Sequence, residues 1–284
     1  IEAVTGVQTC ALPIFGGGTR DIFGAGVFDY FLEYGVAFDR CYGVSAGCAN
    51  IASFLAGQQH RNYEFYTEYA MRKEYMSLDN FIKTGSYVDL DYVYGTLSNS
   101  YGEYPLNFEV LKSNPSEFII IAAEANTGKT KYFTKADLNY NNYAPINASS
   151  CVPVVNKPYK IDGVEYFDGG IADPIPYKKA LDDGCDELVI ILTRPKAGHR
   201  IDNSDKRMAQ ILARQYPKAA ELLEHRAETY NTQLDAIKKL EEEGVAKIIA
   251  PENIGKLKTL TRDVDMLKSL YRKGLVAAKK ADIK

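Results

Sequence analysis

Two short runs of apolar residues do most to limit the folds that this chain can adopt. Residues 117–123 read EFIIIAA and residues 187–192 read ELVIIL, and both runs are almost continuously apolar. Strands of that kind are typical of parallel sheets whose two faces are buried under helices. A further short strand is expected at residues 164–167. We therefore predict the α/β class, with a mostly parallel central sheet between layers of helices.

The segment before these strands has the alternating elements that such a fold needs. Apolar residues at 22–34 recur at helical spacing and directly follow a run of glycines. A β-like run at residues 38–44 leads to Ser45, and small apolar residues at 46–56 predict a buried helix. Helix, strand and helix in this order agree with an α/β sandwich.

Charge divides the 284 residues into two parts. Residues 1–195 hold 15 Lys and Arg against 24 Asp and Glu, whereas residues 196–284 hold 19 against 13. Helical patterning dominates from Asp205 onward, and charges of both signs are mixed there. That mixture is typical of exposed helix faces, so we expect no nucleic-acid partner, while peripheral contact with a membrane stays open. We predict an α/β domain over residues 1–195 and a helical extension over residues 196–284.

Residues 58–114 differ in composition from the rest of the α/β part. Nine tyrosines lie between Tyr63 and Tyr104, with few aliphatic residues to form a separate core. We interpret this segment as an insertion that caps the edge of the sheet. Because tyrosine buries a ring and keeps a hydroxyl group for water, the cap suits either the ordinary packing of helices or a surface for a lipid-like substrate.

The expected compartment is the cytoplasm. The longest apolar runs fall far short of the ~20 residues that cross a bilayer, and the first residues lack the order of regions found in signal peptides. Cysteine is present at an odd number of positions without CxxC spacing, at Cys10, Cys41, Cys48, Cys151 and Cys185. We expect these five thiols to be reduced.

The first motif with chemical meaning is G-x-S-x-G, formed by Gly43, Ser45 and Gly47. It lies where a predicted strand leads into a predicted helix. There the serine occupies a sharp turn that exposes its Oγ atom, and the glycines let neighbouring backbone approach closely. The position of the match favours a nucleophilic serine over a chance occurrence.

The second motif is the glycine run at Gly16, Gly17 and Gly18, followed by Thr19 and Arg20. Consecutive glycines before a helix let several backbone N–H groups converge on one anion, as in an oxyanion hole. Phosphate binding is the alternative, but the dinucleotide fingerprint requires glycine where the next residue is aspartate.

The third motif is Asp168-Gly169-Gly170, directly after the predicted strand at residues 164–167. By itself, an aspartate followed by two glycines can simply form a tight turn. Together with a donor loop and an exposed serine, however, a carboxylate at the end of a strand completes the set of groups needed for acyl transfer.

In this order, GGGTR, GVSAG and DGG resemble the patatin-like phospholipase family. ASSCVP at residues 148–153 is similar to a further segment of that family, and the resemblance covers residues 15–194. The helical remainder resembles the C-terminal extension of bacterial members. The resemblance implies a three-layer sandwich and a serine acyl hydrolase acting on lipid or other acyl esters. The histidines and cysteines lack the paired spacing of metal ligands, so we expect no metal, and we expect no cofactor.

Carried over to this sequence, the resemblance implies Ser45 as the nucleophile and Asp168 as its base, without a histidine. It implies an oxyanion hole formed by the amides of Gly17, Gly18 and Thr19. Arg20 matches a basic residue that holds the loop or orients the ester. The remaining motif glycines are implied as supporting residues: Gly16, Gly43, Gly47 and Gly169.

The chain departs from the family pattern at two places. Asp21 stands where the family usually has glycine, and Pro13 stands where a central strand would need an N–H group. Residues 1–14 resemble translated sequencing-adapter sequence, so we expect them to be non-native and the natural first strand to be missing. The glycine loop would then lack its anchor.

Two other functions stay open from the sequence. The first is an esterase of the α/β-hydrolase type, because Ser45, Asp168 and His199 occur in the chain order that such a triad uses. The second is a non-catalytic lipid-binding protein that uses the tyrosine-rich segment and the basic tail.

Overall fold

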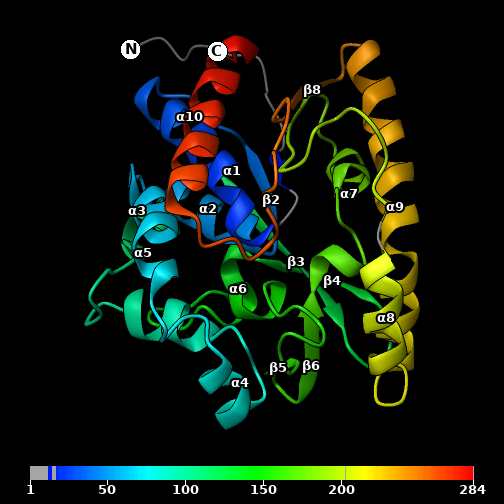
Figure 1. The fold of residues 1–284 in the computed structure, drawn as a ribbon. Coiled ribbons are helices and arrows are strands. Elements are labelled where there is room, and N and C mark those ends of the chain that lie inside the picture. Colours follow the sequence, from blue (N-terminus) through cyan, green and yellow to red (C-terminus); the bar gives the residue numbers. More distant parts are fainter. Residues whose placement is uncertain (1–11, 15–16, 202, 284) are drawn as a thin grey trace.

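In the computed structural model, which describes residues 12–14, 17–201 and 203–283, one sheet of eight strands is covered by helices on both faces (Figure 1). Hydrogen bonds connect the strands along the path β5-β6-β3-β2-β1-β7-β8, and β4 also pairs with β3. The strands are β1 (Leu12–Ile14), β2 (Arg40–Val44), β3 (Glu117–Glu124), β4 (Thr130–Thr134), β5 (Tyr159–Ile161), β6 (Val164–Asp168), β7 (Leu188–Ile191) and β8 (Ala246–Ile249).

The helices fall into three groups along the chain. The first group follows the glycine loop and comprises η1 (Gly18–Asp21), α1 (Ile22–Glu33) and α2 (Ala46–Leu55). The cap and the middle of the chain hold α3 (Arg61–Thr67), η2 (Tyr69–Met71), α4 (Leu78–Thr84), the π-helix η3 (Tyr92–Leu97), α5 (Phe108–Ser113), η4 (Lys135–Asp137), α6 (Ala144–Ser149), η5 (Gly169–Ile171) and α7 (Tyr177–Asp182). The last group is α8 (Asn203–Leu212), α9 (Pro217–Glu242) and α10 (Val264–Ala281).

The continuous apolar run of β3 is explained by burial on both faces, as predicted. Phe118 and Ile120 pack into a core with α1, α2 and α10, whereas Ile119 and Ile121 pack into a second core with α7 and α9. Figure 1 shows these two groups of helices on opposite sides of the sheet. The three-layer α/β sandwich expected from the sequence is therefore confirmed.

The strand expected at residues 164–167 is present as β6, but it is not part of a parallel ladder. It runs antiparallel to β3 and to β5. Its antiparallel pairing with β5 has a local cause, because β5 and β6 form a hairpin whose two turn residues, Asp162 and Gly163, have φ angles of 49° and 86°. Two residues with positive φ are the signature of a type I′ turn. The sheet is thus mixed, with its parallel strands at β3-β2-β1-β7-β8.

The position of the first strand is occupied, and the loss of the natural first strand stays a prediction. Residues 12–14 form β1, which pairs in parallel with β2 and with β7 near the centre of the sheet. Pro13 removes only one N–H group from this ladder, and the residues on either side keep theirs. Residues 1–11 and Gly16 lie outside the described part of the chain, and the non-native origin of residues 1–14 stays a prediction.

The C-terminal extension is helical, as predicted, and also supplies a strand that was not expected. Its strand β8 pairs in parallel with β7 and forms one edge of the sheet. Its last helix, α10, lies against α1, where the Tyr271 hydroxyl donates a hydrogen bond of 2.7 Å to the buried Asp29. The extension therefore forms one edge of the sheet and contributes to the cores on both of its faces.

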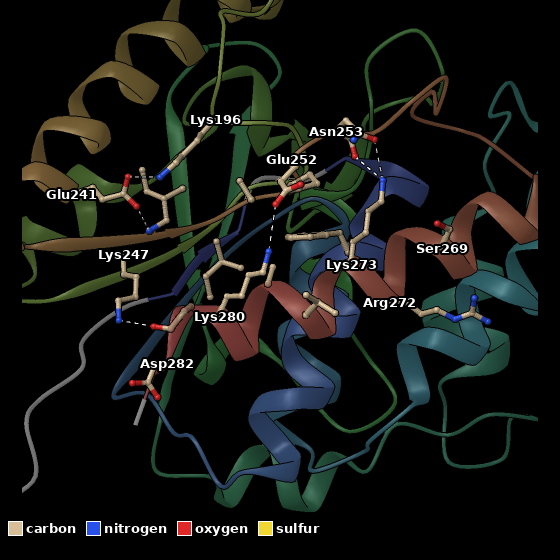
Figure 2. Close-up of a pocket in the computed structure, with 18 residues that line it drawn as sticks. Lys196, Glu241, Lys247, Glu252, Asn253, Ser269, Arg272, Lys273, Lys280 and Asp282 are labelled. Carbon is tan, nitrogen blue, oxygen red and sulfur yellow. Dashed lines mark hydrogen bonds and ion pairs between the residues drawn. The ribbon is translucent and has the colours of Figure 1, made fainter.

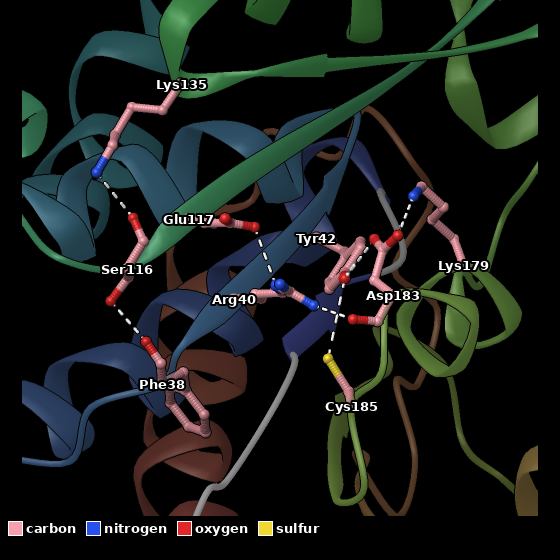
Figure 3. A network of polar contacts seen from close by, with 9 residues as sticks. All are labelled: Phe38, Arg40, Tyr42, Ser116, Glu117, Lys135, Lys179, Asp183 and Cys185. Carbon is pink, nitrogen blue, oxygen red and sulfur yellow. Dashed lines mark hydrogen bonds and ion pairs between the residues drawn. The ribbon is translucent and has the colours of Figure 1, made fainter.

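Polar contacts hold the amino ends of β2 and β3, opposite the end where the motifs gather. Arg40 at the start of β2 pairs with Glu117 at the start of β3 at 2.9 Å. The Tyr42 hydroxyl donates to Asp183 at 2.8 Å, which connects β2 to the segment after α7 (Figure 3). These contacts fix the strands at the end that is free of candidate catalytic groups.

The described residues bear on the expected state of the cysteines and on membrane-spanning helices. Their four cysteines, Cys41, Cys48, Cys151 and Cys185, are buried free thiols, which confirms that prediction, and Cys10 lies outside them. No helix within the described ranges combines the length and apolar character that a bilayer span demands.

The close approach of α1 and α10 gives a test of the packing. A Cβ atom added to Gly274 would lie 2.1 Å from the Phe23 carbonyl oxygen, so Gly274→Ala must push the two helices apart. We expect a loss of about 1–3 kcal/mol in the free energy of unfolding, measured by urea denaturation. Gly95→Ala, where a Cβ atom meets nothing within 4 Å, is the matched control and should cost little. Equal effects at the two glycines would contradict the packing.

Candidate active site

Ser45 lies at the sharp turn between β2 and α2 that the G-x-S-x-G motif predicts. Its backbone has φ of 56° and ψ of −132°, a left-handed conformation that is strained for a residue with a side chain. A Cβ atom on Gly43 would lie 2.9 Å from Cys48 Cα, so α2 can turn back over β2 only because Gly43 has no side chain. The turn presents a serine that is 8% exposed at the carboxyl end of β2.

The register of β3 brings Asp168 to the same place. At Ile121, β3 has β2 on one edge and β4 on the other. At Ala122, it has β6 on one edge and again β4 on the other. Therefore β2 and β6 lie on the same edge of β3, opposite β4. Val44 is opposite Ile121, and Asp168 is opposite the next residue, Ala122. Because β2 and β6 are antiparallel to each other, their carboxyl ends meet, and Ser45 follows directly after Val44.

Asp168 is a buried carboxyl group in contact with Ser45. It is 5% exposed, and burial raises its pKa above the ordinary value of 3.8. The nearby Ser45 hydroxyl and the Gly170 amide, which donates a hydrogen bond of 2.7 Å to the carboxyl group, act in the opposite direction. The structure therefore brings together the two residues that the sequence singled out as nucleophile and base.

Ser149 connects the serine turn to β3, a role that the sequence analysis did not assign. Its hydroxyl group donates to the Ile121 carbonyl at 2.5 Å and accepts a hydrogen bond of 2.9 Å from the Ser45 amide. It comes from α6, in the ASSCVP segment already noted. On the other side, a Cβ atom on Gly169 would lie 2.2 Å from the Ile121 oxygen, which explains why glycine follows Asp168.

The glycine loop lies beside this pair, but most of its amides already have partners. The Gly17 amide donates to the Asp21 carboxyl group at 3.2 Å, and the Thr19 amide donates to the Thr259 carbonyl at 2.9 Å. Of the three amides implied as an oxyanion hole, only that of Gly18 makes no such contact within the described residues. Gly18 has a φ of 56°, a conformation that favours glycine.

Asp21, which replaces the usual glycine of the family, is explained by its contact with the loop. Its side chain is fully buried, and burial raises its pKa well above the ordinary value. Its carboxyl group accepts a hydrogen bond from the Gly17 amide and so connects the two ends of the glycine loop. This departure from the family pattern therefore supports the loop.

A cavity of about 210 Å³ opens over Ser45 and Asp168. Its apolar wall includes Tyr75 and Tyr94 of the cap, and the C-terminal extension contributes Leu260. Tyr75 and Tyr94 have raised pKa values because they are buried. Part of the tyrosine-rich segment thus lines the cavity, while Tyr69 and Tyr104 stack on each other elsewhere in the cap.

Four arginines also line the cavity, at Arg20, Arg194, Arg200 and Arg226. Only Arg20 was singled out from the sequence. Its side chain is 4% exposed, and its Nε donates to the Gly17 carbonyl at 3.3 Å, so it contacts the loop as expected. The other three follow β7 or lie on α9, where the sequence shows only a generally basic composition.

Histidine is not found at this cavity among the described lining residues. His199 lies 2.9 Å from Asp235 at the protein surface. His60 pairs with Asp29, and His225 pairs with Glu228. The structure therefore does not bring His199 to Ser45, as a Ser-Asp-His triad would require.

A larger cavity of about 870 Å³ lies between β8 and α10 (Figure 2). Two of its lysines pair with glutamates, Lys196 with Glu241 at 2.6 Å and Lys280 with Glu252 at 3.5 Å. Ser269 lines it without a carboxylate contact among the described residues. Of these two cavities, the smaller one is where the described lining residues place a serine beside a buried carboxyl group.

Comparison with known proteins agrees with this geometry. A family model described as patatin-like phospholipase matches residues 14–181, and a domain of unknown function, DUF6363, matches residues 216–281. The uncharacterized protein YjjU of Escherichia coli (strain K12) is 30% identical over 207 residues, which are 71% of this chain and 57% of that protein.

Two further similarities concern more distant proteins. An uncharacterized NTE family protein of Mycobacterium tuberculosis (strain ATCC 25618 / H37Rv) is 25% identical over 72% of this chain and 54% of its own length. The chain thus spans a little over half the length of these curated relatives. The crystal structure of VipD from Legionella pneumophila shares the fold, with a TM-score of 0.51 and 12% identity over 97% of this chain and 67% of that one.

The strained backbone of Ser45 gives a test that does not depend on activity. Glycine adopts this conformation without strain, so Ser45→Gly should be more stable than Ser45→Ala by about 1 kcal/mol in urea denaturation. At Ser53, inside α2, the same comparison should favour alanine by about 1 kcal/mol. A preference for alanine at both positions would contradict the strained turn.

Proposed function

Because the chain belongs to the patatin-like phospholipase family, we propose that it is a serine acyl hydrolase that cleaves carboxylic esters of lipids. The observation that supports this most is the contact between the Ser45 hydroxyl and the buried carboxyl group of Asp168. The apolar wall of the cavity suits an acyl chain. A lipid substrate would reach this site by peripheral contact with a membrane.

The proposed reaction proceeds through an acyl-enzyme. Asp168 accepts the proton of Ser45 while Oγ attacks the ester carbonyl, and a tetrahedral intermediate forms. When the intermediate collapses, the C–O bond to the alcohol breaks and Asp168 returns the proton to the leaving oxygen. Water then attacks the acyl-serine, Asp168 accepts its proton, and Ser45 regains a proton as the acid leaves.

The raised pKa of Asp168 serves this mechanism. An ordinary aspartate is a weak base toward an alcohol, and burial makes this carboxylate more basic. The contact with Ser45 supplies the proximity on which the rest of the rate depends.

Stabilisation of the oxyanion is assigned to the glycine loop. The Gly18 amide is the first donor, because it makes no contact with Asp21 or Thr259. The Thr19 amide becomes a second donor when it releases the Thr259 carbonyl. Each such donor contributes about 10²–10³ to the rate.

Hydrolysis of p-nitrophenyl butyrate tests the assignment. We expect Ser45→Ala and Asp168→Asn each to lower kcat by at least about 10³, because each removes a group that acts in both steps. His199→Ala should retain activity, since its ring is at the surface. Circular dichroism of each variant serves as the control for folding. Full activity in either of the first two variants, or its loss in the third, would contradict the dyad.

The pH profile tests the role of Asp168 separately. The ionised carboxylate is the active base, so kcat/KM should be retained above its pKa and fall about tenfold per pH unit below it. Because burial raises the pKa, the loss should begin above the ordinary value of 3.8. Circular dichroism in the same buffers separates this loss from unfolding. Activity unchanged down to pH 3.8 would contradict Asp168 as the base.

A further inference from the structure

Two guanidinium groups at the Ser45 cavity, one buried and one half-buried, have no anionic hydrogen-bond partner among the described residues. Arg20 is 4% exposed, and its Nε atom donates a hydrogen bond to the neutral Gly17 carbonyl. Arg194 has a buried Nε atom without a hydrogen-bond partner, and it makes no ion pair within the described residues. Both side chains line the same cavity as Ser45 and Asp168.

The other two arginines at the cavity, Arg200 and Arg226, differ from Arg20 and Arg194 because both contact a carboxylate. Asp205 is fully buried and lies 2.9 Å from both Arg200 Nη2 and Arg226 Nε. Asp168 is not a corresponding anionic partner for Arg194. The groups that act on the Asp168 carboxyl are Ser45, Gly170 and the positive charge of Arg226. Arg20 and Arg194 are thus the cations at the cavity that a bound anion would satisfy.

Repulsion within the cavity supports this view. The pKa of Arg20 is lowered to about 9, first by burial and then by the positive charges of Arg194 and Arg200. The negative charge of Asp21 raises the pKa of Arg20, but by less than burial and the neighbouring arginines lower it. Cations kept close together and out of water are costly unless a ligand of opposite charge joins them. The flat, forked guanidinium group matches the oxygens of phosphate and carboxylate.

The fold holds Arg194 in place beside the glycine loop. It follows Thr193, whose fully buried side chain packs so closely that a Cβ atom on Gly17 would lie 2.5 Å from its Oγ1 atom. Arg194 lies between the two segments that the family models match, residues 14–181 and 216–281. Neither match therefore assigns it a role.

We propose that Arg194, together with Arg20, forms a subsite that binds an anionic oxygen group, phosphate or carboxylate, carried by the ester substrate next to its scissile bond. This inference rests on the proposed function. It predicts that the protein prefers anionic esters to neutral esters of the same size.

Two matched pairs of substrates test the preference and separate the two anion sources. Mono-p-nitrophenyl succinate is compared with p-nitrophenyl butyrate, and dihexanoyl phosphatidic acid with dihexanoylglycerol. In Arg194→Met, the ratio of kcat/KM for the anionic to the neutral ester should fall about 10–100-fold, as expected for loss of a charge-assisted contact. Arg194→Lys should restore part of the ratio, and Arg214→Met, at an exposed position, is the matched control.

The outcomes distinguish this subsite from a structural role and from failure of the proposed function. If the ratio of kcat/KM falls for the phosphate pair alone, or for the carboxylate pair alone, that result identifies the source of the anion. Equal losses on anionic and neutral esters, or an unchanged ratio, would overturn the subsite. Calorimetric titration of the wild type and of Arg194→Met with inorganic phosphate provides a readout without turnover.

If no ester is hydrolysed, the proposed function fails, and the phosphate titration then decides the subsite alone. Binding that is lost in Arg194→Met but kept in Ser45→Ala would support it. Absence of binding to the wild type, or equal binding to Arg194→Met, would overturn it.

Discussion

The candidate site depends on one constraint: β2 and β6 each pair with the same edge of β3. The two strands run toward each other, so the last residue of β2 and the last of β6 face consecutive residues of β3, Ile121 and Ala122. A register shift of one residue would turn side chains to the other face of the sheet. The hydroxyl group of Ser149 and the missing side chain of Gly169 close the junction around the Ile121 carbonyl.

The C-terminal extension belongs to the same physical unit as this junction. Its strand β8 continues the sheet beyond β7, and α10 packs on α1, the helix that follows the glycine loop. Thr259 accepts a hydrogen bond from the Thr19 amide, and Arg226 of α9 lines the cavity. The extension thus shapes both the donor loop and the charge of the cavity. Its removal would expose the cores on both faces of the sheet as well as the site.

The sequence was informative where local chemistry determines structure. Continuous apolar runs predicted β3 and β7, and G-x-S-x-G predicted the turn at Ser45, because those signals depend on neighbouring residues. Long-range contacts left no such signal. The antiparallel direction of β6, the use of the Thr19 amide by Thr259, and the approach of Arg194 to Arg20 depend on residues far apart in the chain. Pro13 was misjudged because its neighbours maintain the ladder.

The central claim is that Asp168 alone activates Ser45. The most direct measurement is the rate at which a fluorophosphonate probe labels the protein, with the modified residue located by mass spectrometry. The account predicts labelling at Ser45, with a rate at least about 100-fold lower in Asp168→Asn than in the wild type. Labelling at another serine, no labelling, or an unchanged rate in Asp168→Asn would contradict it.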